Sequence, residues 1–208
     1  MDENIKTSLE TLSEIKHLME RSSKFISLSG LSGVFAGVYA LSGAYAAYLY
    51  LNSSGLQSNY ESHETGSYTG YSFFVVDAVI VLLLAIGTGI FLTTRKARRD
   101  GNSIFDPTAK KLLINLCIPL FTGGLFCLAL IFQGTLIYIS PAMLIFYGLA
   151  LINASKYTLS DVRVLGIIEV ILGITAAFII GYGLLFWAFG FGVCHIAYGS
   201  YMYFKYEK

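Results

Sequence analysis

The sequence predicts an all-α, polytopic membrane protein, with six transmembrane helices in three successive hairpins preceded by a cytoplasmic amphipathic helix. Of its 208 residues, 55% are hydrophobic and 13% are charged, whereas about 25% are charged in a typical soluble domain. Several apolar runs reach about 20 residues, the length that a helix needs to cross the hydrocarbon core of a bilayer. The net charge of +1 gives no electrostatic reason to expect binding to nucleic acid.

Residues 1–24 are predicted to form the cytoplasmic amphipathic helix. This segment mixes acidic and basic residues, unlike the basic start of a cleaved signal peptide. We expect its apolar face to pack on the protein's own inner loops, on a second copy or on a separate cytoplasmic protein partner, with a lipid surface as a further alternative. The apolar residues recur at three- and four-residue steps: Ile5, Leu9, Leu12, Ile15 and Met19.

Residues 25–208 are predicted to form the transmembrane domain. Pro119 predicts a kink in the third span, and Ser140-Pro141 either begins the fourth helix or kinks it. The six spans are expected at about 25–51, 71–94, 112–132, 136–157, 162–181 and 184–204.

The distribution of positive charge predicts the orientation. If the N-terminus is cytoplasmic, all 14 Lys and Arg residues fall in the inner segments. The predicted outer loop, residues 52–70, contains none of them. Because positive residues stay on the cytoplasmic side, both termini are predicted to be cytoplasmic.

Small residues at four-residue spacing predict close helix packing, since lipid supplies no hydrophobic drive for helices to associate. In the first span they form a face that either packs within the chain or makes a homo-oligomer. A second set lies on the fifth and sixth spans. The predicted packing residues are Ser29, Gly33 and Gly37 in the first span, and Gly173, Ala177, Gly181, Gly192 and Gly199 in the last two.

Two titratable residues in the last two spans are predicted to touch. If the chain reverses at residues 181–183, Gly173 meets Gly192 and Glu169 lies within one residue of His195. An unpaired charge is costly inside a bilayer, so we expect a neutral Glu169 that shares a proton with His195. This pair could be a structural clip, a proton or ligand site, or a catalytic pair. Asp77, in the second span, could reach the interface or line an outward cavity.

Motif searches give no reason to expect an enzyme, a cofactor or a metal. No common metalloprotease, nucleotide-binding or calcium-binding motif is present. Gly30-Leu-Ser-Gly33 matches the motif around the serine nucleophile of rhomboid intramembrane proteases, but it lies on the first span, and that family's other motifs are missing. Cys117, Cys127 and Cys194 all fall in predicted spans and are read as inert thiols.

Four stretches carry a resemblance to a known family: "ERSSKFISLSGLSG", "LIFYGLALINASKYTL", "GIIEVILG" and "GLLFWAFGFGVCHIAYGSYMYFKY". They resemble a family of small six-span bacterial integral membrane proteins whose function is unknown. The resemblance implies a bacterial cytoplasmic (inner) membrane and no activity. Neighbouring genes for small winged-helix regulators, which we associate with this family, suggest a regulatory partnership.

Two classes of function follow from these observations. The first is a non-enzymatic scaffold, sensor or regulatory protein that contacts a partner through its cytoplasmic segments. The second is a small transporter or an ion or proton pathway that uses Glu169, His195 and Asp77. The sequence shows no inverted repeat, which is the usual symmetry of a transporter, so the first class is preferred.

Overall fold

A computed structural model of the chain describes residues 28–54, 71–101 and 107–208. The predicted amphipathic helix at residues 1–24 and most of the predicted outer loop lie outside these ranges. The described residues are helical apart from short connections, and they contain no strand. The prediction of an all-α protein is therefore confirmed for the described part of the chain.

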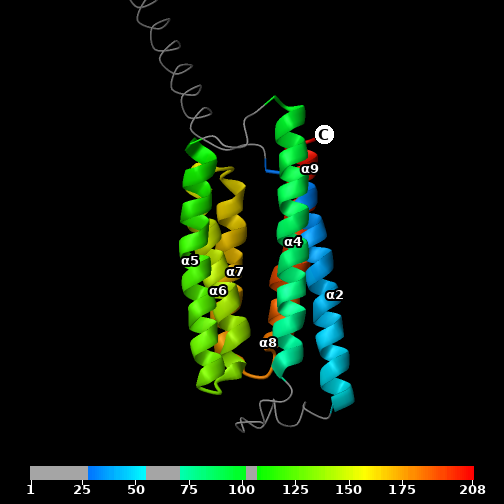
Figure 1. Cartoon of the computed structure of the whole chain (residues 1–208), viewed down its shortest axis with the longest axis vertical. Coiled ribbons are helices and arrows are strands. Elements are labelled where there is room, and N and C mark those ends of the chain that lie inside the picture. The colour runs from blue at the N-terminus through cyan, green and yellow to red at the C-terminus, as the bar shows by residue number, and fades with distance from the viewer. Residues whose placement is uncertain (1–27, 55–70, 102–106) are drawn as a thin grey trace, which may run out of the picture.

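The helices run side by side along the long axis of the molecule (Figure 1). Two single 3₁₀ turns, Leu136–Tyr138 and Ser155–Tyr157, flank α6. α8, a π-helical segment called η4 and α9 follow one another without a break. The elements are α2 (Gly30–Ser54), α4 (Tyr71–Arg99), α5 (Pro107–Phe132), α6 (Ile139–Ala154), α7 (Asp161–Phe178), α8 (Gly183–Trp187), η4 (Ala188–Cys194) and α9 (His195–Tyr206).

Five helices in the described ranges are long and apolar enough to cross a membrane: Gly30–Ser53, Ser72–Arg99, Pro107–Phe132, Leu136–Tyr157 and Gly183–Tyr206. The fifth predicted span corresponds to α7, which is not among them. α7 has 18 residues and includes the charged residues Asp161, Arg163 and Glu169. Five of the six predicted spans thus coincide with such helices. That α7, the fifth predicted span, crosses a membrane stays a prediction.

Two helices extend beyond their predicted apolar runs. α4 continues to Arg99, and α5 already begins at Pro107. A basic stretch ends an apolar run without ending a helix, because Lys, Arg and Ala are good helix formers and positive charge is favourable at a helix C-terminus. Proline suits the first position of α5, where its missing N–H has no partner to lose. Pro141 likewise lies in the first turn of α6.

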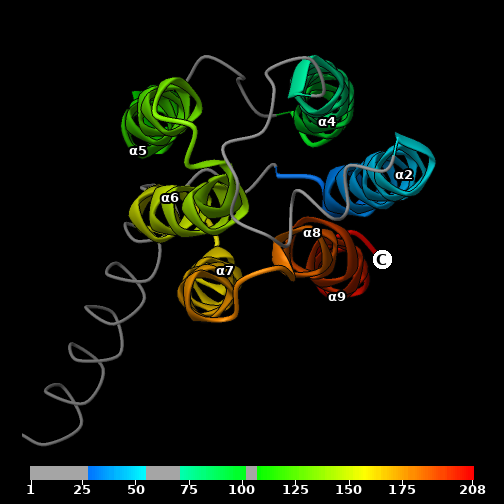
Figure 2. The ribbon, with the colours of Figure 1, turned by 90° about the horizontal axis from the view of Figure 1, so that it is seen from below.

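The helices fall into two groups, which are visible end-on in Figure 2. In one group α6 packs between α5 and α7, and in the other α2 packs against α4 and α9. Consecutive helices α7 and α8 are connected, but α7 packs chiefly on α6, whereas η4 and α9 pack chiefly on α2. The first and last spans of the chain are therefore neighbours.

This arrangement corrects the predicted register of the last two helices. A Cβ atom added to Gly173 would meet Ile145 and Pro141 of α6, and one added to Gly192 would meet Leu41 of α2. The prediction that Gly173 and Gly192 meet is therefore wrong. It assumed that consecutive helices pack along their whole length, whereas each glycine faces a different helix.

Gly181 also differs from its predicted packing role. It lies in the exposed turn between α7 and α8, with φ at 96°, and a Cβ atom there would meet nothing within 4 Å. This left-handed backbone conformation favours glycine. Gly181 therefore serves the turn, while Ala177, nearby in α7, is half-buried.

The small residues of α2 form the contact with α9. A Cβ atom at Gly199 would lie 2.5 Å from the Val34 amide nitrogen and 2.6 Å from the Gly30 carbonyl oxygen. One at Gly33 would lie 3.1 Å from the Gly199 Cα atom. The two backbones can approach this closely only because side chains are absent. The face is thus occupied within the chain and is not available to a second copy.

A group of polar residues, which we call the end clamp (Lys96, Glu207 and the first residues of α2), ties three helices at one end. The buried Lys96 amine donates to the Leu28 carbonyl oxygen at 2.8 Å and lies 3.4 Å from Glu207 Oε1. The Gly30 N–H donates to the same carboxylate, and the Ser29 hydroxyl donates to its other oxygen at 3.4 Å. Glu207 therefore caps the start of α2, where negative charge is favourable.

The contact between α2 and α9 predicts a difference between two glycine-to-alanine variants. Gly199→Ala should lower the free energy of unfolding by about 1–3 kcal/mol, because its methyl group would collide with the backbone of α2. Gly87→Ala, in α4, is the matched control, since a Cβ atom there meets nothing within 4 Å. Thermal unfolding of both variants in one detergent measures the difference, and equal melting temperatures would contradict the close contact.

Candidate functional site

Three side chains from three helices form a polar group inside the bundle, which we call the core cluster: the partly buried Tyr147 of α6 and the buried Glu169 of α7 and His195 at the start of α9. The exposed fraction is 0% for Glu169 and 6% for His195. The contact predicted between Glu169 and His195 is present, with 3.5 Å between Glu169 Oε1 and His195 Nδ1. Tyr147 was not foreseen, because a lone tyrosine in an apolar span carries no pattern.

The partners of His195 determine which ring nitrogen carries the proton. Its Nδ1 atom lies 3.0 Å from the Gly190 carbonyl oxygen, and its Nε2 atom lies 2.7 Å from the Tyr147 hydroxyl. A carbonyl oxygen can only accept, so Nδ1 must be the donor. In the neutral ring Nε2 is then an acceptor, and the Tyr147 hydroxyl donates to it.

Glu169 is held without a hydrogen bond. Neither of its carboxyl oxygens has a hydrogen-bonding partner among the described residues, and the nearby Nδ1–H of His195 is already directed to Gly190. An ionised carboxylate in such surroundings would be costly. The geometry thus agrees with the predicted neutral Glu169, but not with the predicted sharing of its proton with His195, because no hydrogen bond joins the two side chains. The carboxyl group is left free to bind a further donor or acceptor.

The π-helical segment η4 shapes the helix around this carboxyl group. A Cβ atom at Gly190 would lie 2.5 Å from Glu169 Oε2, so a larger residue there would displace the carboxyl group. Phe191 packs beside the cluster, with its ring centroid 5.0 Å from that of Tyr147 and 5.9 Å from that of His195. π-helical turns are frequent at functional sites. The paired glycines Gly190 and Gly192 were the only sequence signal for this segment.

Asp77 is not part of the core cluster. It lies half-buried in the contact between α4 and α2, where a Cβ atom at Gly43 would be 3.1 Å from Asp77 Oδ2. Glu169 and His195 lie between α6, α7 and α9. The structure therefore brings together two of the three residues that were predicted to form an intramembrane site.

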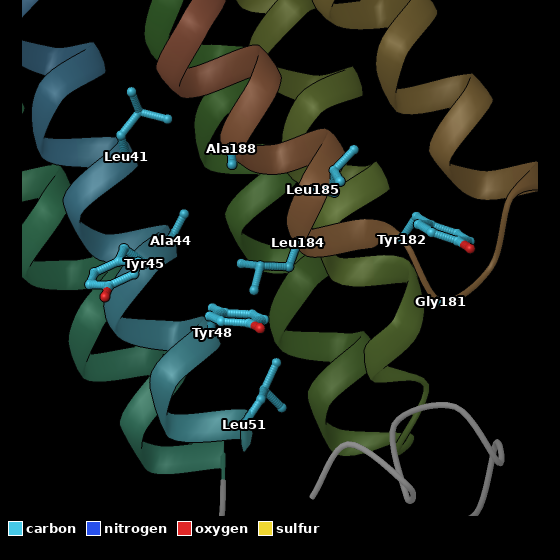
Figure 3. A pocket seen from close by; sticks show the side chains of 10 residues that line it. All are labelled: Leu41, Ala44, Tyr45, Tyr48, Leu51, Gly181, Tyr182, Leu184, Leu185 and Ala188. Atoms are coloured by element: carbon cyan, nitrogen blue, oxygen red, sulfur yellow. The ribbon is translucent and has the colours of Figure 1, made fainter. Parts of the chain in front are cut away.

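An apolar crevice at the opposite end of the bundle from the end clamp has a volume of about 380 Å³. Figure 3 shows α2 on one side of it and α8 with the preceding turn on the other. Glu169 and His195 do not line it, so the crevice gives no opening to the core cluster. Its lining residues are Leu41, Ala44, Tyr45, Tyr48, Leu51, Gly181, Tyr182, Leu184, Leu185 and Ala188.

The other candidates for chemistry remain separate from one another. The Ser32 hydroxyl donates to the Ser29 carbonyl oxygen at 2.5 Å, whereas the His195 ring is engaged by Tyr147 and Gly190. The three cysteines, all within the described ranges, are free thiols. The described residues contain no group of three His, Cys, Asp or Glu side chains that could hold a metal ion.

The structure thus defines a helical bundle with membrane-length apolar helices and one enclosed polar cluster. No protein-family model matches the chain, and neither the curated proteins nor the solved structures that were searched give a match. The resemblance to small bacterial membrane proteins therefore stays a prediction.

Two tyrosine-to-phenylalanine variants test the core cluster. Tyr147→Phe should lower the free energy of unfolding by about 1–3 kcal/mol, because it leaves His195 Nε2 buried without a donor. Tyr198→Phe is the matched control. The Tyr198 hydroxyl is buried without a partner, so its removal should leave stability unchanged or slightly raised. Denaturant unfolding in detergent compares the two, and a larger loss for Tyr198→Phe would overturn the assignment.

Proposed function

We propose that the chain is a six-span integral protein of a bacterial cytoplasmic membrane, with α7 as the fifth of its six spans in sequence order and with three successive helical hairpins. The surface of α4 supports contact with lipid, because none of its most apolar window is buried within the chain and Leu83, Ile90 and Phe91 are each more than 60% exposed. Water does not favour so extended an apolar surface. α7 lies alongside α6, and its Glu169 is covered by neighbouring helices.

The proposed orientation places both termini in the cytoplasm. In the described ranges, Lys and Arg residues occur only at the helix ends that meet around the end clamp, at the top of Figure 1. Three exposed tyrosines, Tyr45, Tyr48 and Tyr182, lie toward the opposite end, and Tyr201 and Tyr206 are exposed near the end clamp. Positive charge on the cytoplasmic side and aromatic residues at the interfaces support this orientation.

In this six-span arrangement, with both termini in the cytoplasm, the chain acts as a non-enzymatic scaffold, sensor or regulatory protein through its cytoplasmic segments. The end clamp is the observation that carries this proposal. Residues 1–27 join the described bundle at Leu28, whose carbonyl oxygen accepts from the buried Lys96 amine. The carboxylate of Glu207 holds both Lys96 and the start of α2. The point from which the predicted partner-binding helix leaves the membrane domain is therefore fixed by three helices.

Deleting residues 1–20 should abolish co-purification of a cytoplasmic partner while leaving the membrane domain folded. Leu12→Asp, on the predicted apolar stripe, should have the same effect, and Ser13→Asp, beside that stripe, is its matched control. Cross-linking in membranes before purification measures the partner, and thermal unfolding measures the fold. A deletion that unfolds the bundle would show that the segment packs internally instead.

A second candidate function is a proton or ion pathway through the core cluster. The two unpartnered carboxyl oxygens of Glu169 favour it, because buried polar groups in proteins nearly always have a partner. Against it, Glu169 and His195 are buried and the crevice between α2 and α8 is not lined by either of them.

Thiol labelling separates the two candidates. His195→Cys, in a background with Cys117, Cys127 and Cys194 replaced, should stay unlabelled by a membrane-impermeant reagent applied to either side. Tyr48→Cys, half exposed at the opposite end, is the positive control in the same background. Labelling of folded His195→Cys from both sides would establish a water path through the site and favour transport.

A further inference from the structure

We propose that the apolar crevice between α2 and α8 binds one acyl chain of a membrane phospholipid, whose polar head group lies at the mouth of the crevice, beside Tyr48 and Tyr182. The inference goes beyond the proposed contact with a cytoplasmic partner, and it rests on the proposed insertion of the protein into a membrane. It assigns a ligand to the end of the bundle that lies opposite the end clamp.

One face of α2 both closes the contact with α9 and forms a wall of the crevice. As far as Gly37 the backbones touch, because a Cβ atom there would lie 2.6 Å from the Gly192 carbonyl oxygen. From Leu41 onward the same face carries larger side chains, and these line the crevice. The residues of this face follow one another at steps of three or four: Gly30, Gly33, Gly37, Leu41, Ala44, Tyr48 and Leu51.

The facing wall changes in the same way beyond Gly192. Leu41 fills the space beside Gly192, where a Cβ atom would collide with it. The wall then continues through Ala188, Leu184 and Gly181, which line the crevice. α2 has extensive contacts with α9 and η4 but fewer with α8. The two helices therefore separate beyond Gly192, and the space between them is the crevice in Figure 3.

The length of the crevice matches one leaflet of a bilayer. It follows α2 from Leu41 to Leu51, which is about 15 Å at the rise of an α-helix. The hydrocarbon core of a bilayer is ~30 Å thick, so the acyl chains of one leaflet extend through about 15 Å. The volume of about 380 Å³ also lies in the range of ligand pockets, which is roughly 300–1,000 Å³. One acyl chain lying along α2 therefore has the length that the crevice offers.

The lining favours hydrocarbon over water. It consists of aliphatic side chains, a glycine and three tyrosines, and none of these residues is charged. Water stays in a cavity only where several polar groups bind it, and an empty crevice would leave its walls without dispersion contacts. Tyr45 and Leu185 are each more than 60% exposed, so the crevice is open along its side. In a bilayer, the fluid that reaches this opening is lipid.

The mouth of the crevice supplies the polar groups that a phospholipid needs. Tyr48, near the end of α2, and Tyr182, in the turn before α8, are each more than half exposed. Their hydroxyls can donate to ester and phosphate oxygens, and tyrosine is enriched where the lipid head groups lie. In the described ranges, Lys and Arg occur only at the other end of the bundle. The crevice should therefore select the acyl chain and not the charge of the head group.

Photo-cross-linking of the full-length protein in phosphatidylcholine vesicles tests the inference. The probe is a phosphatidylcholine with a diazirine near the methyl end of one acyl chain, and mass spectrometry of peptides locates the label. We expect label at Leu41 and Ala188, at the inner end of the crevice, and at the exposed Leu83 and Phe91 of α4. When the protein is extracted into excess detergent before illumination, the α4 label should be lost and the crevice label should persist.

Filling the crevice should remove its label. Ala188→Leu should lower the label at Leu41 about tenfold, equivalent to about 1.4 kcal/mol of binding free energy, because the larger side chain would occupy the inner end. Ala129→Leu, on the exposed surface of α5, is the matched control and should leave the label unchanged. Thermal unfolding of both variants checks their fold. Unlabelled phosphatidylglycerol and phosphatidylcholine should compete with the probe equally, since no charged residue lines the crevice.

The outcomes separate this inference from the proposed function. Label on α4 without label in the crevice would overturn the inference and leave the proposed membrane insertion intact. Loss of the crevice label in detergent, full label in folded Ala188→Leu or a preference for phosphatidylglycerol would overturn it too. Absence of label from both places would contradict the membrane insertion as well. The maps of the wild-type protein need no variant, so the inference can fail even if Ala188→Leu does not fold. Deletion of residues 1–20 tests the partner separately.

Discussion

The burial of Glu169 is the constraint on which the arrangement of the helices depends. A carboxyl group with no exposed surface must be covered on every side, and three separate helices contribute to that cover. Tyr147 orients His195, His195 lies beside the carboxyl group, and Gly190 removes the side chain that would otherwise occupy the space. A change of register in α6, α7 or η4 would expose a polar group to lipid, which is costly.

Glycine contacts and the end clamp close the bundle around this core. α2 and α9, from opposite ends of the chain, approach closely at Gly33 and Gly199 because neither carries a side chain there. Glu207 then joins the end of α9 to Lys96 and to the start of α2. The glycine packing along the two helices and the ion pair at their end therefore both hold α2 against α9. The position of Leu28, the first described residue of the chain, depends on both.

In the described ranges, Lys and Arg occur only at the end of the bundle that carries the end clamp, and the core cluster lies enclosed between α6, α7 and α9. This enclosure supports the proposed scaffold, sensor or regulatory protein over the alternative of a transporter, since transport requires access from both sides in turn.

The sequence by itself determined the helical class and the approximate limits of five membrane-length helices, because these follow from apolar run length. The contact between Glu169 and His195 was also predicted, but from a register of the last two helices that proved wrong at Gly173 and Gly192. It did not determine which helices are neighbours, since small residues indicate close packing without naming the partner. Gly173 and Gly192 were paired wrongly for this reason, and Gly181 proved to be a turn residue. Only the tertiary structure brought Tyr147 and Gly190 to the site and Glu207 to Lys96, because contacts between distant segments depend on how the whole chain packs.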